Sequence, residues 1–182
     1  MFMDILAMLI LLKKLQKKID EFKNFGFSSQ TTADQIGINA KMSEFNAALG
    51  LLQLKQIDRD IEKRKSIDKK YRKLLKDIPG IRCHIQSRTG RSNYSYFPIF
   101  IDSTYHMTRN QLYEKLKDNG IFARKYWYPL ITDFLVYQQN SKHKEKILIN
   151  AEKIANTTLC LPIYSELKHE SIELISNLIK SN

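Results

Sequence analysis

The sequence of 182 residues contains few of the residues that break regular structure or build metal and redox sites. Six glycines and four prolines are too few for long disordered tracts. The two cysteines, Cys83 and Cys160, form no CxxC pair, and no histidine stands at the spacing of a zinc site. We therefore expect a reduced, cytoplasmic chain with both cysteines in the core and without a metal site.

Long hydrophobic runs and familiar catalytic motifs are also missing. The opening MFMDILAMLILLKK is shorter than the about 20 apolar residues that span a bilayer. Its lysines follow the apolar run, and no small-x-small cleavage site is evident, so we expect neither a membrane span nor a signal peptide. The sequence has no P-loop, GxGxxG, HExxH or nucleophile elbow, which argues against the enzyme classes that these motifs define.

Positive charge is abundant, with a formal net charge of +11 at pH 7. Such a balance favours anionic partners, among them phosphates, nucleotides and nucleic acids. Residues 55–77 contain ten lysines and arginines but also five interspersed acidic residues. This pattern is more typical of a solvated helix face with i,i+4 ion pairs than of a nucleic-acid surface, so nucleic acid is an unlikely partner.

Helical periodicity dominates the first half of the chain. Apolar residues at spacings of three, four and three predict a helix over residues 5–22. A polar loop follows, and Ser43 is expected to cap a helix with one apolar face. That face comprises Phe45, Ala48, Leu49 and Leu52. A charged helix comes next, and a slip in its apolar phase predicts a bend or break near residues 63–65.

Strands and helices alternate in the second half. The segments IRCHI, YSYFPIFI, IFARKYWY and LCLPIY are strand candidates, and Pro98 predicts an edge or bulge position for the second of them. Helices are expected at residues 108–118, where Thr108 and Gln111 form a capping box, and at residues 147–156 and 171–180. The fold class is thus α/β (α+β), with long N-terminal helices followed by a small sheet that has helices packed on one face.

Two short motifs can carry chemistry. Asn39 and Lys41 precede a helix N-terminus, where an amide, an ammonium group and unpaired backbone N–H groups suit a phosphate; the alternative is an ordinary polar loop. The run Arg124-Lys125-Tyr126-Trp127-Tyr128-Pro129 suits a pocket for a nucleotide or sugar. It suits equally well a strand with Tyr126 and Tyr128 on one face and Lys125 and Trp127 on the other.

Several segments occur in an order that resembles a known family. They are NFGF, GINAKMSEFNAALGLLQL with its basic continuation IEKRKSIDKKYRKLL, NGIFARKYWYPL and LCLPIYSEL. Together they resemble the C-terminal portion of the DegT/DnrJ/EryC1/StrS family. Its members are pyridoxal-phosphate (PLP) dependent aminotransferases of fold type I that act on nucleotide-linked keto sugars, for surface polysaccharides or antibiotics.

The resemblance assigns roles to both motifs. It implies that Asn39 contacts the cofactor phosphate of a neighbouring subunit, with Lys41 nearby at a position often held by arginine. It implies that Tyr126 and Tyr128, with Lys125 beside them, border the sugar substrate. Residues 1–42 would then be an N-terminal helix and cofactor-proximal loop remaining from a large domain. Residues 43–182 would be a helical connector and the small C-terminal α/β domain. The implied partners are a nucleotide-linked keto sugar, glutamate as amino donor, and a homodimer mate or an N-terminal half.

One departure from the family pattern bears on activity. The family's Schiff-base lysine, the aspartate that pairs the pyridine nitrogen and the aromatic that stacks on the ring precede the NFGF segment, and MFMDILAMLILL does not resemble that region. We therefore expect no catalytic residue in these 182 positions and no turnover by them alone, which leaves it uncertain that the chain by itself is an enzyme. Three hypotheses stay open: a truncated aminotransferase, one half of a split enzyme, or a basic nucleic-acid-binding or structural module.

Overall fold

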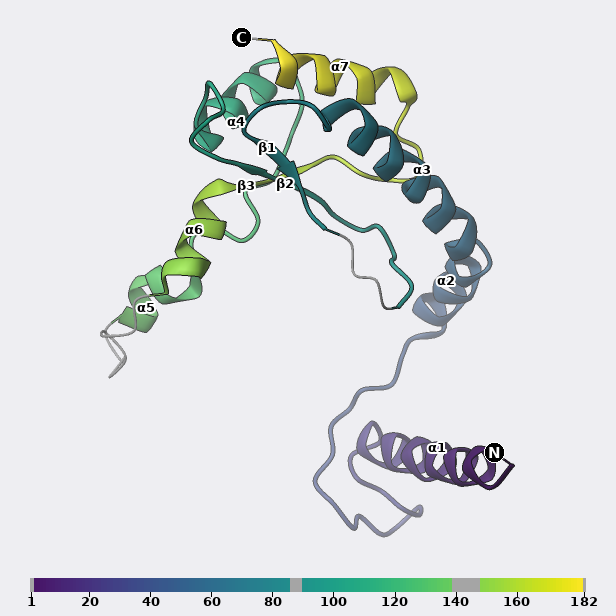
Figure 1. The fold of residues 1–182 in the computed structure, drawn as a ribbon. Coiled ribbons are helices and arrows are strands. Elements are labelled where there is room, and N and C mark those ends of the chain that lie inside the picture. Colours follow the sequence, from purple (N-terminus) through teal and green to yellow (C-terminus); the bar gives the residue numbers. More distant parts are fainter. Residues whose placement is uncertain (1, 86–89, 139–147, 182) are drawn as a thin grey trace. The chain divides into compact units, whose positions relative to one another are not determined.

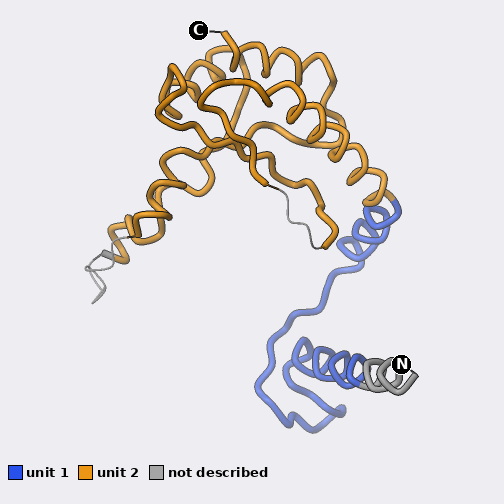
Figure 2. Tube along the Cα trace, viewed as in Figure 1, with its two compact units in different colours: residues 1–55 blue, residues 56–182 orange. Residues whose placement is uncertain are grey.

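The computed structural model describes residues 2–85, 90–138 and 148–181. The chain divides into two compact units, Met1–Lys55 and Gln56–Asn182, which Figure 2 shows in different colours. The boundary between residues 42 and 43 that we expect from the sequence lies within the first unit.

The first unit contains helix α1 (Phe2–Phe22), a loop and helix α2 (Glu44–Leu54). The expected N-cap is confirmed, because the side chain of Ser43 accepts a hydrogen bond from the backbone N–H of Asn46 at 3.2 Å. No residue of α2 is buried. Its apolar side chains therefore remain exposed, and they add no core to this unit.

The second unit holds three strands and the remaining helices (Figure 1). In chain order these are α3 (Ile57–Leu75), β1 (Ile81–Cys83), β2 (Phe97–Ile101), α4 (Arg109–Asp118), the 3₁₀ helix η1 (Ile131–Asp133), α5 (Leu135–Gln138), α6 (Ile149–Thr157), β3 (Thr158–Leu161) and α7 (His169–Lys180). The expected capping box is confirmed, since Thr108 and Gln111 bond reciprocally at the start of α4.

The strands form one antiparallel sheet in the order β1-β2-β3. Period-2 alternation gives β2 two different faces. Phe97, Ile99 and Ile101 are buried in the hydrophobic core of the unit. The core is completed by side chains from α3, α4, β3 and α7, among them Tyr71, Leu112, Leu116, Leu159, Ile172, Ile175 and Ile179.

Helices cover both faces of the sheet, so the expectation of helices on one face is wrong. Figure 1 shows α3, α4 and α7 on one side and α6 on the other, where α6 contacts β2. Pro98 and Phe100 point to this second side and are only half-buried. The second face is therefore thinly covered, and it holds the hollow described below.

The charged helix shows no break near residues 63–65, because α3 runs unbroken from Ile57 to Leu75. Its buried residues begin at Ile67, and the two turns before it are exposed or half-buried. The N-terminal part of α3 packs on no core that would require its apolar residues to stay in phase. A slip in the pattern there needs no break in the backbone.

Two further strand expectations are corrected. The segment from residue 121 to 128 forms no strand; Arg124 alone makes a bridge, to Cys160. The β–α–β–α–β–α order expected for the second half therefore lacks its middle strand, and the regular elements between β2 and β3 are all helices. Pro98 lies in the central strand rather than at an edge. Cys160 is buried as expected, whereas Cys83 is only part-buried, and both are free thiols.

Candidate functional site

The loop after α1 is fixed by backbone hydrogen bonds to the end of that helix. The N–H of Ile38 donates to the carbonyl of Phe22 at 2.8 Å, and the N–H of Ala40 donates to Lys23 at 3.0 Å. Two glycines allow the chains to meet this closely. A Cβ on Gly26 would lie 1.7 Å from the carbonyl oxygen of Gln35, and one on Gly37 would lie 2.2 Å from the nitrogen of Gly26.

Asn39 and Lys41, the predicted cofactor-binding residues, lie on this anchored loop. Asn39 forms a backbone bridge with Asn24, and its side chain is exposed. Lys41 is exposed as well, with Nζ 5.7 Å from the centre of the Phe25 ring. An amide N–H and an ammonium group are donors that suit a phosphate, so the donor set fits the cofactor group that the sequence resemblance implies.

The predicted substrate-binding residues occupy one turn of the second unit. Arg124 exchanges two backbone hydrogen bonds with Cys160, at 2.9 and 2.8 Å, which fixes the start of the turn against β3. The N–H of Tyr128 then donates to the carbonyl of Lys125 at 3.0 Å. Because the backbone turns at this point, the strand alternative for residues 125–128, with Tyr126 and Tyr128 on one face, does not hold.

The side chains of this turn diverge. Tyr126 stacks on Trp127, with ring centroids 4.8 Å apart and planes inclined by 22°. Lys125 places Nζ 4.1 Å from the centre of the Tyr113 ring on α4. Tyr128 lies under the guanidinium of Arg109 at 4.6 Å. Tyr126 thus shares a surface with Trp127, whereas Lys125 and Tyr128 contact α4.

Tyr126 and Trp127 line a hollow on the second face of the sheet, which we call the aromatic groove. It has a volume of about 410 Å³. Its floor comprises Tyr96, Pro98, Phe100, Thr158 and Cys160, and Ala151, Ile154 and Ala155 of α6 form one wall. Aromatic rings facing one hollow can bind a flat ring or the apolar face of a sugar by stacking.

Tyr96 is a groove residue that the sequence reasoning did not single out. Its ring meets Tyr126 edge-on, with centroids 5.8 Å apart, and Trp127 at 6.3 Å. The signal was present in YSYFPIF, where Tyr96, Pro98 and Phe100 recur at every second position and therefore share one face.

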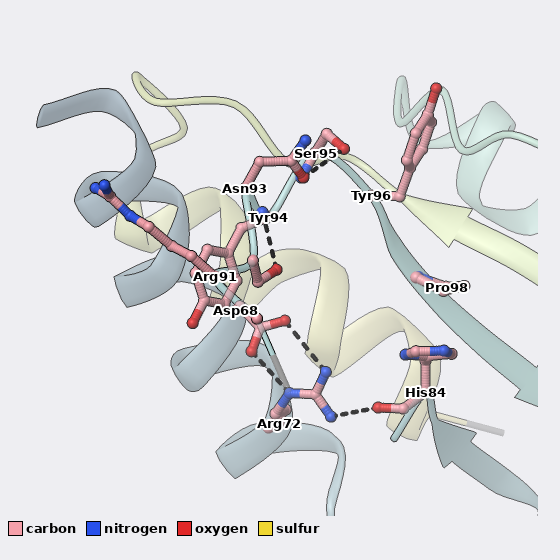
Figure 3. A pocket seen from close by; sticks show the side chains of 11 residues that line it. Asp68, Arg72, His84, Arg91, Asn93, Tyr94, Ser95, Tyr96 and Pro98 are labelled. Atoms are coloured by element: carbon pink, nitrogen blue, oxygen red, sulfur yellow. Dashed lines mark hydrogen bonds and ion pairs between the residues drawn. The ribbon is translucent and has the colours of Figure 1, made fainter. Parts of the chain in front are cut away.

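A second hollow of about 420 Å³ lies beside α3 and the start of β2 (Figure 3). Arg72 donates to both carboxylate oxygens of Asp68, at 2.7 and 3.2 Å, and to the carbonyl of His84 at 2.7 Å. Arg91 reaches the other end of this hollow and pairs with Asp58 at 2.7 Å. Each arginine has an acidic partner here, which makes this hollow a poorer anion site than the exposed loop of the first unit.

Within residues 2–85, 90–138 and 148–181, no group of three histidine, cysteine, aspartate or glutamate side chains could hold a metal ion. In the same ranges, no helix combines the length and the apolar character needed to cross a membrane.

The small antiparallel sheet with its helices occurs in known enzymes. Solved structures that match the chain are aminotransferases of fold type I. One is DesI in the presence of its TDP-sugar product, with a TM-score of 0.78 and 30% identity over 90% of this chain and 41% of that one. Another is PseC of Helicobacter pylori, an aminotransferase involved in the biosynthesis of pseudoaminic acid, with a TM-score of 0.78, 26% identity, and coverage of 91% and 45%.

The sequence comparison is more specific. The profile of the DegT/DnrJ/EryC1/StrS aminotransferase family matches residues 11–180, and the chain belongs to this family. A dTDP-4-amino-4,6-dideoxy-D-glucose transaminase of Escherichia coli is 48% identical over 166 residues, and one of Shigella dysenteriae is 44% identical over 168. The resemblance seen in the sequence is thereby confirmed.

Aminotransferases of the family use PLP, which supplies the electron sink for amino transfer when bound. The chain spans 45% of the length of each of the two transaminases named above, and 91% and 92% of its own length take part in the matches.

Proposed function

We propose that this chain forms the C-terminal part of a PLP-dependent aminotransferase that places an amino group on a dTDP-linked 4-keto-6-deoxy sugar. The observation that carries the proposal is the 48% identity to the Escherichia coli dTDP-4-amino-4,6-dideoxy-D-glucose transaminase over 91% of this chain. The name of that relative states the nucleotide, the aminated carbon and the deoxy position. The amino donor is glutamate, and the reaction serves aminosugar and surface polysaccharide biosynthesis in the cytoplasm.

Asn39 and Lys41 are the residues of this chain proposed to hold the cofactor. The Asn39 amide donates to a phosphate oxygen, and the Lys41 ammonium adds positive charge at the same group. Both side chains are exposed, which supports a contact to a phosphate held by another subunit of a homodimer or by another part of the enzyme. The backbone bonds of Ile38 and Ala40 to α1 support a loop that is ordered before the phosphate binds.

The aromatic turn is proposed to border the sugar. Tyr126 supplies a ring face toward the groove, and Tyr128 and Lys125 lie on the adjacent side of the same turn. Rings at this border exclude water and orient a sugar by stacking on its apolar face. These residues bind and orient; the lysine that bonds the cofactor belongs to the family region that precedes NFGF. The proposal therefore concerns an assembly that contains such a region.

A chimera tests this proposal. Residues 11–180 would replace the matching 45% of the Escherichia coli transaminase, and amino transfer from glutamate to a dTDP-linked 4-keto-6-deoxy sugar would be measured. We expect activity within about tenfold of the parent. A tenfold loss corresponds to an increase of the activation free energy by about 1.4 kcal/mol, which small misplacements of binding groups can cause. A folded, PLP-loaded chimera without transfer to any nucleotide-linked keto sugar would contradict the proposal.

Variants of the chimera test the site. Asn39→Ala is expected to weaken PLP retention about tenfold or more through the loss of a charge-assisted hydrogen bond. The matched control is Asn46→Ala, which removes another exposed asparagine side chain of the same unit. Equal PLP retention in the two variants would remove Asn39 from the phosphate site.

The 182-residue chain alone is expected to be inactive. Mixed with PLP, it should give no visible absorbance band that depends on a particular lysine. Coexpression with the N-terminal portion of the Escherichia coli transaminase then separates two hypotheses, because recovery of amino transfer supports a split enzyme and its absence supports a truncated one.

Nucleic-acid binding receives less support. Several cations of the charged helix α3 have acidic partners, including the pairs Lys63–Glu166, Lys65–Glu62 and Lys70–Glu173. These contacts leave α3 with fewer unpaired cations than its composition indicates. Salt-dependent retention of DNA or RNA by the chain would reopen this alternative.

A further inference from the structure

A buried arginine contacts both α6 and the aromatic turn, the two segments beside the aromatic groove. Arg109 occupies the first position of α4 and is 5% exposed. Among residues 2–85, 90–138 and 148–181 it makes no ion pair with a carboxylate. A buried guanidinium without an acidic partner is costly, so the contacts that it does make call for an explanation.

The first contact of Arg109 is with the end of α6. Nη1 donates to the carbonyl oxygen of Ala155 at 3.3 Å. This carbonyl belongs to the last turn of α6, whose oxygens lack partners within the helix and carry partial negative charge. The neighbouring carbonyl, of Ile154, is taken by the Thr158 hydroxyl at 2.6 Å. Arg109 therefore completes the end of the helix that forms one wall of the groove.

The second contact is with the aromatic turn. The guanidinium carbon lies 4.6 Å from the centre of the Tyr128 ring, which is a cation–π distance. Tyr128 follows Trp127 directly, and Trp127 lines the groove together with Tyr126. The start of the turn is fixed by the backbone bonds of Arg124 to β3, and its far end has Arg109 as its support.

A second nitrogen of the guanidinium, Nε, indicates what sets the position of the side chain. Nε of Arg109 is buried without a hydrogen-bond partner. If Arg109 only capped α6, its side chain could rotate until Nε found a hydrogen-bond partner. Because the guanidinium contacts both the Tyr128 ring and the Ala155 carbonyl, that rotation would break one of the two contacts. Burial also lowers the pKa of the Arg109 guanidinium from its ordinary value, because the charged form is held away from water.

We propose that Arg109 is a positioning residue that sets the width of the aromatic groove by holding Tyr128 of the turn and Ala155 of α6 at the same time. It lines neither wall and touches no substrate. Its importance for a sugar substrate rests on the proposed function, but its effect on the groove does not. The two can therefore fail separately.

The chain contains one tryptophan, Trp127, and this residue reports on the groove without any ligand. In the free 182-residue chain, steady-state fluorescence anisotropy and the near-UV circular dichroism of Trp127 measure how firmly the turn is held. We expect Tyr128→Leu and Arg109→Met each to lower both signals, while far-UV circular dichroism stays unchanged. Arg109→Lys keeps a charge but cannot reach both contacts with a planar group, so it should fall between wild type and Arg109→Met.

Two controls make the measurement specific. Tyr128→Phe keeps the ring and should behave as wild type. Arg82→Met removes an exposed arginine 4.5 Å from the Phe100 ring, a contact that carries no bond to α6, and it too should leave Trp127 unchanged. Because Tyr128 is half-exposed, Tyr128→Leu decides the matter even where Arg109→Met unfolds. Unchanged Trp127 signals in folded Tyr128→Leu, or an equal loss in Arg82→Met, overturn the proposal.

The active chimera adds a second readout. There Arg109→Met should raise the KM for the nucleotide sugar about tenfold, the equivalent of one misplaced binding contact, with a smaller effect on kcat. An equal loss of kcat with unchanged KM would contradict a role in positioning the groove. If the chimera is inactive in every form, the proposed function fails, and the Trp127 signals still decide the role of Arg109.

Discussion

Arg72 donates from Nη1 to the carbonyl oxygen of His84 at 2.7 Å, at the point where a proline leaves that oxygen without a strand partner. The N–H of His84 donates to the carbonyl of Pro98 at 3.3 Å, and a residue with a backbone N–H at position 98 would complete the pair. Proline cannot donate, so the guanidinium takes its place. The side-chain hydrogen bond from Arg72 in place of a backbone one explains how a central strand accommodates Pro98.

Arg72→Met is expected to destabilise the second unit by about 1.5–3 kcal/mol, the range for hydrogen bonds to charged groups. The change removes the donor to His84 and the bidentate partner of Asp68, whose carboxylate is 3% exposed. Urea unfolding measures the free energy. Lys73→Met, at an exposed position of the same helix, is the matched control and should cost less than about 0.5 kcal/mol. Equal costs for the two variants would show that Arg72 does not support the strand.

Glu173→Gln should destabilise the protein at neutral pH but not in acid. The hydrogen bond from Lys70, 2.6 Å long, and the charge of that lysine hold the pKa of Glu173 below its ordinary value of 4.5. A lowered folded-state pKa adds stability above the unfolded-state pKa, and this stability disappears as the pH falls through the folded-state value. Thermal unfolding of wild type and Glu173→Gln should therefore converge as the pH falls below the folded-state pKa of Glu173.

Lys70→Met provides the control for that experiment. Because α3 then lacks the partner of Glu173, adding Glu173→Gln to this background should produce little further change at any pH. A difference between wild type and Glu173→Gln that persists unchanged into acid would contradict the assignment of the pair.

The two cysteines should differ in reactivity. Burial raises the pKa of Cys160 to about 11, and burial also raises the pKa of the part-buried Cys83. At pH 8 a thiol with a pKa of about 11 is thiolate to on the order of one part in a thousand. Iodoacetamide should thus label Cys83 before Cys160, as mass spectrometry of tryptic peptides would show. Equal rates in the native protein, rather than only in urea, would show that the groove floor is open.

The isolated chain is expected to self-associate through α2. Phe45, Leu49 and Leu52 are 77%, 47% and 57% exposed, and none of the residues of α2 is buried. A helix with this much apolar surface is normally covered. Light scattering should show a larger mass for wild type than for Phe45→Ser/Leu52→Ser, while Leu174→Ser, at an exposed leucine of α7, should behave as wild type. A monomeric wild type would contradict this prediction.

Local signals in the sequence located most of the regular elements. Ser43 and Thr108 mark the starts of α2 and α4, because a cap is decided by residues within one turn of itself. The apolar spacing of Ile172, Ile175 and Ile179 located the buried face of α7 for the same reason. Both candidate site segments are proposed from the sequence because short runs of Asn, Lys and aromatic residues stand out in it.

Features that depend on distant partners were missed. The sequence predicts an edge or bulge position for Pro98, because nothing near it in the sequence reveals that Arg72 supplies the missing donor. The residues from Lys125 to Tyr128 have a sequence that suits a strand. In the structure, Lys125 and Tyr128 contact Tyr113 and Arg109 of α4 instead. Whether Asn39, Lys41 and these tyrosines bind cofactor and sugar remains a prediction.

Gly26 and Gly37 of the first unit limit how its loop can be engineered. Because Gly26 and Gly37 meet main chain to main chain, neither position tolerates even a methyl group, whereas the side chain of Asn39 stands outside this crossing. The crossing therefore depends on two residues without side chains, and a change of the Asn39 side chain is expected to leave the main-chain contacts of the loop in place.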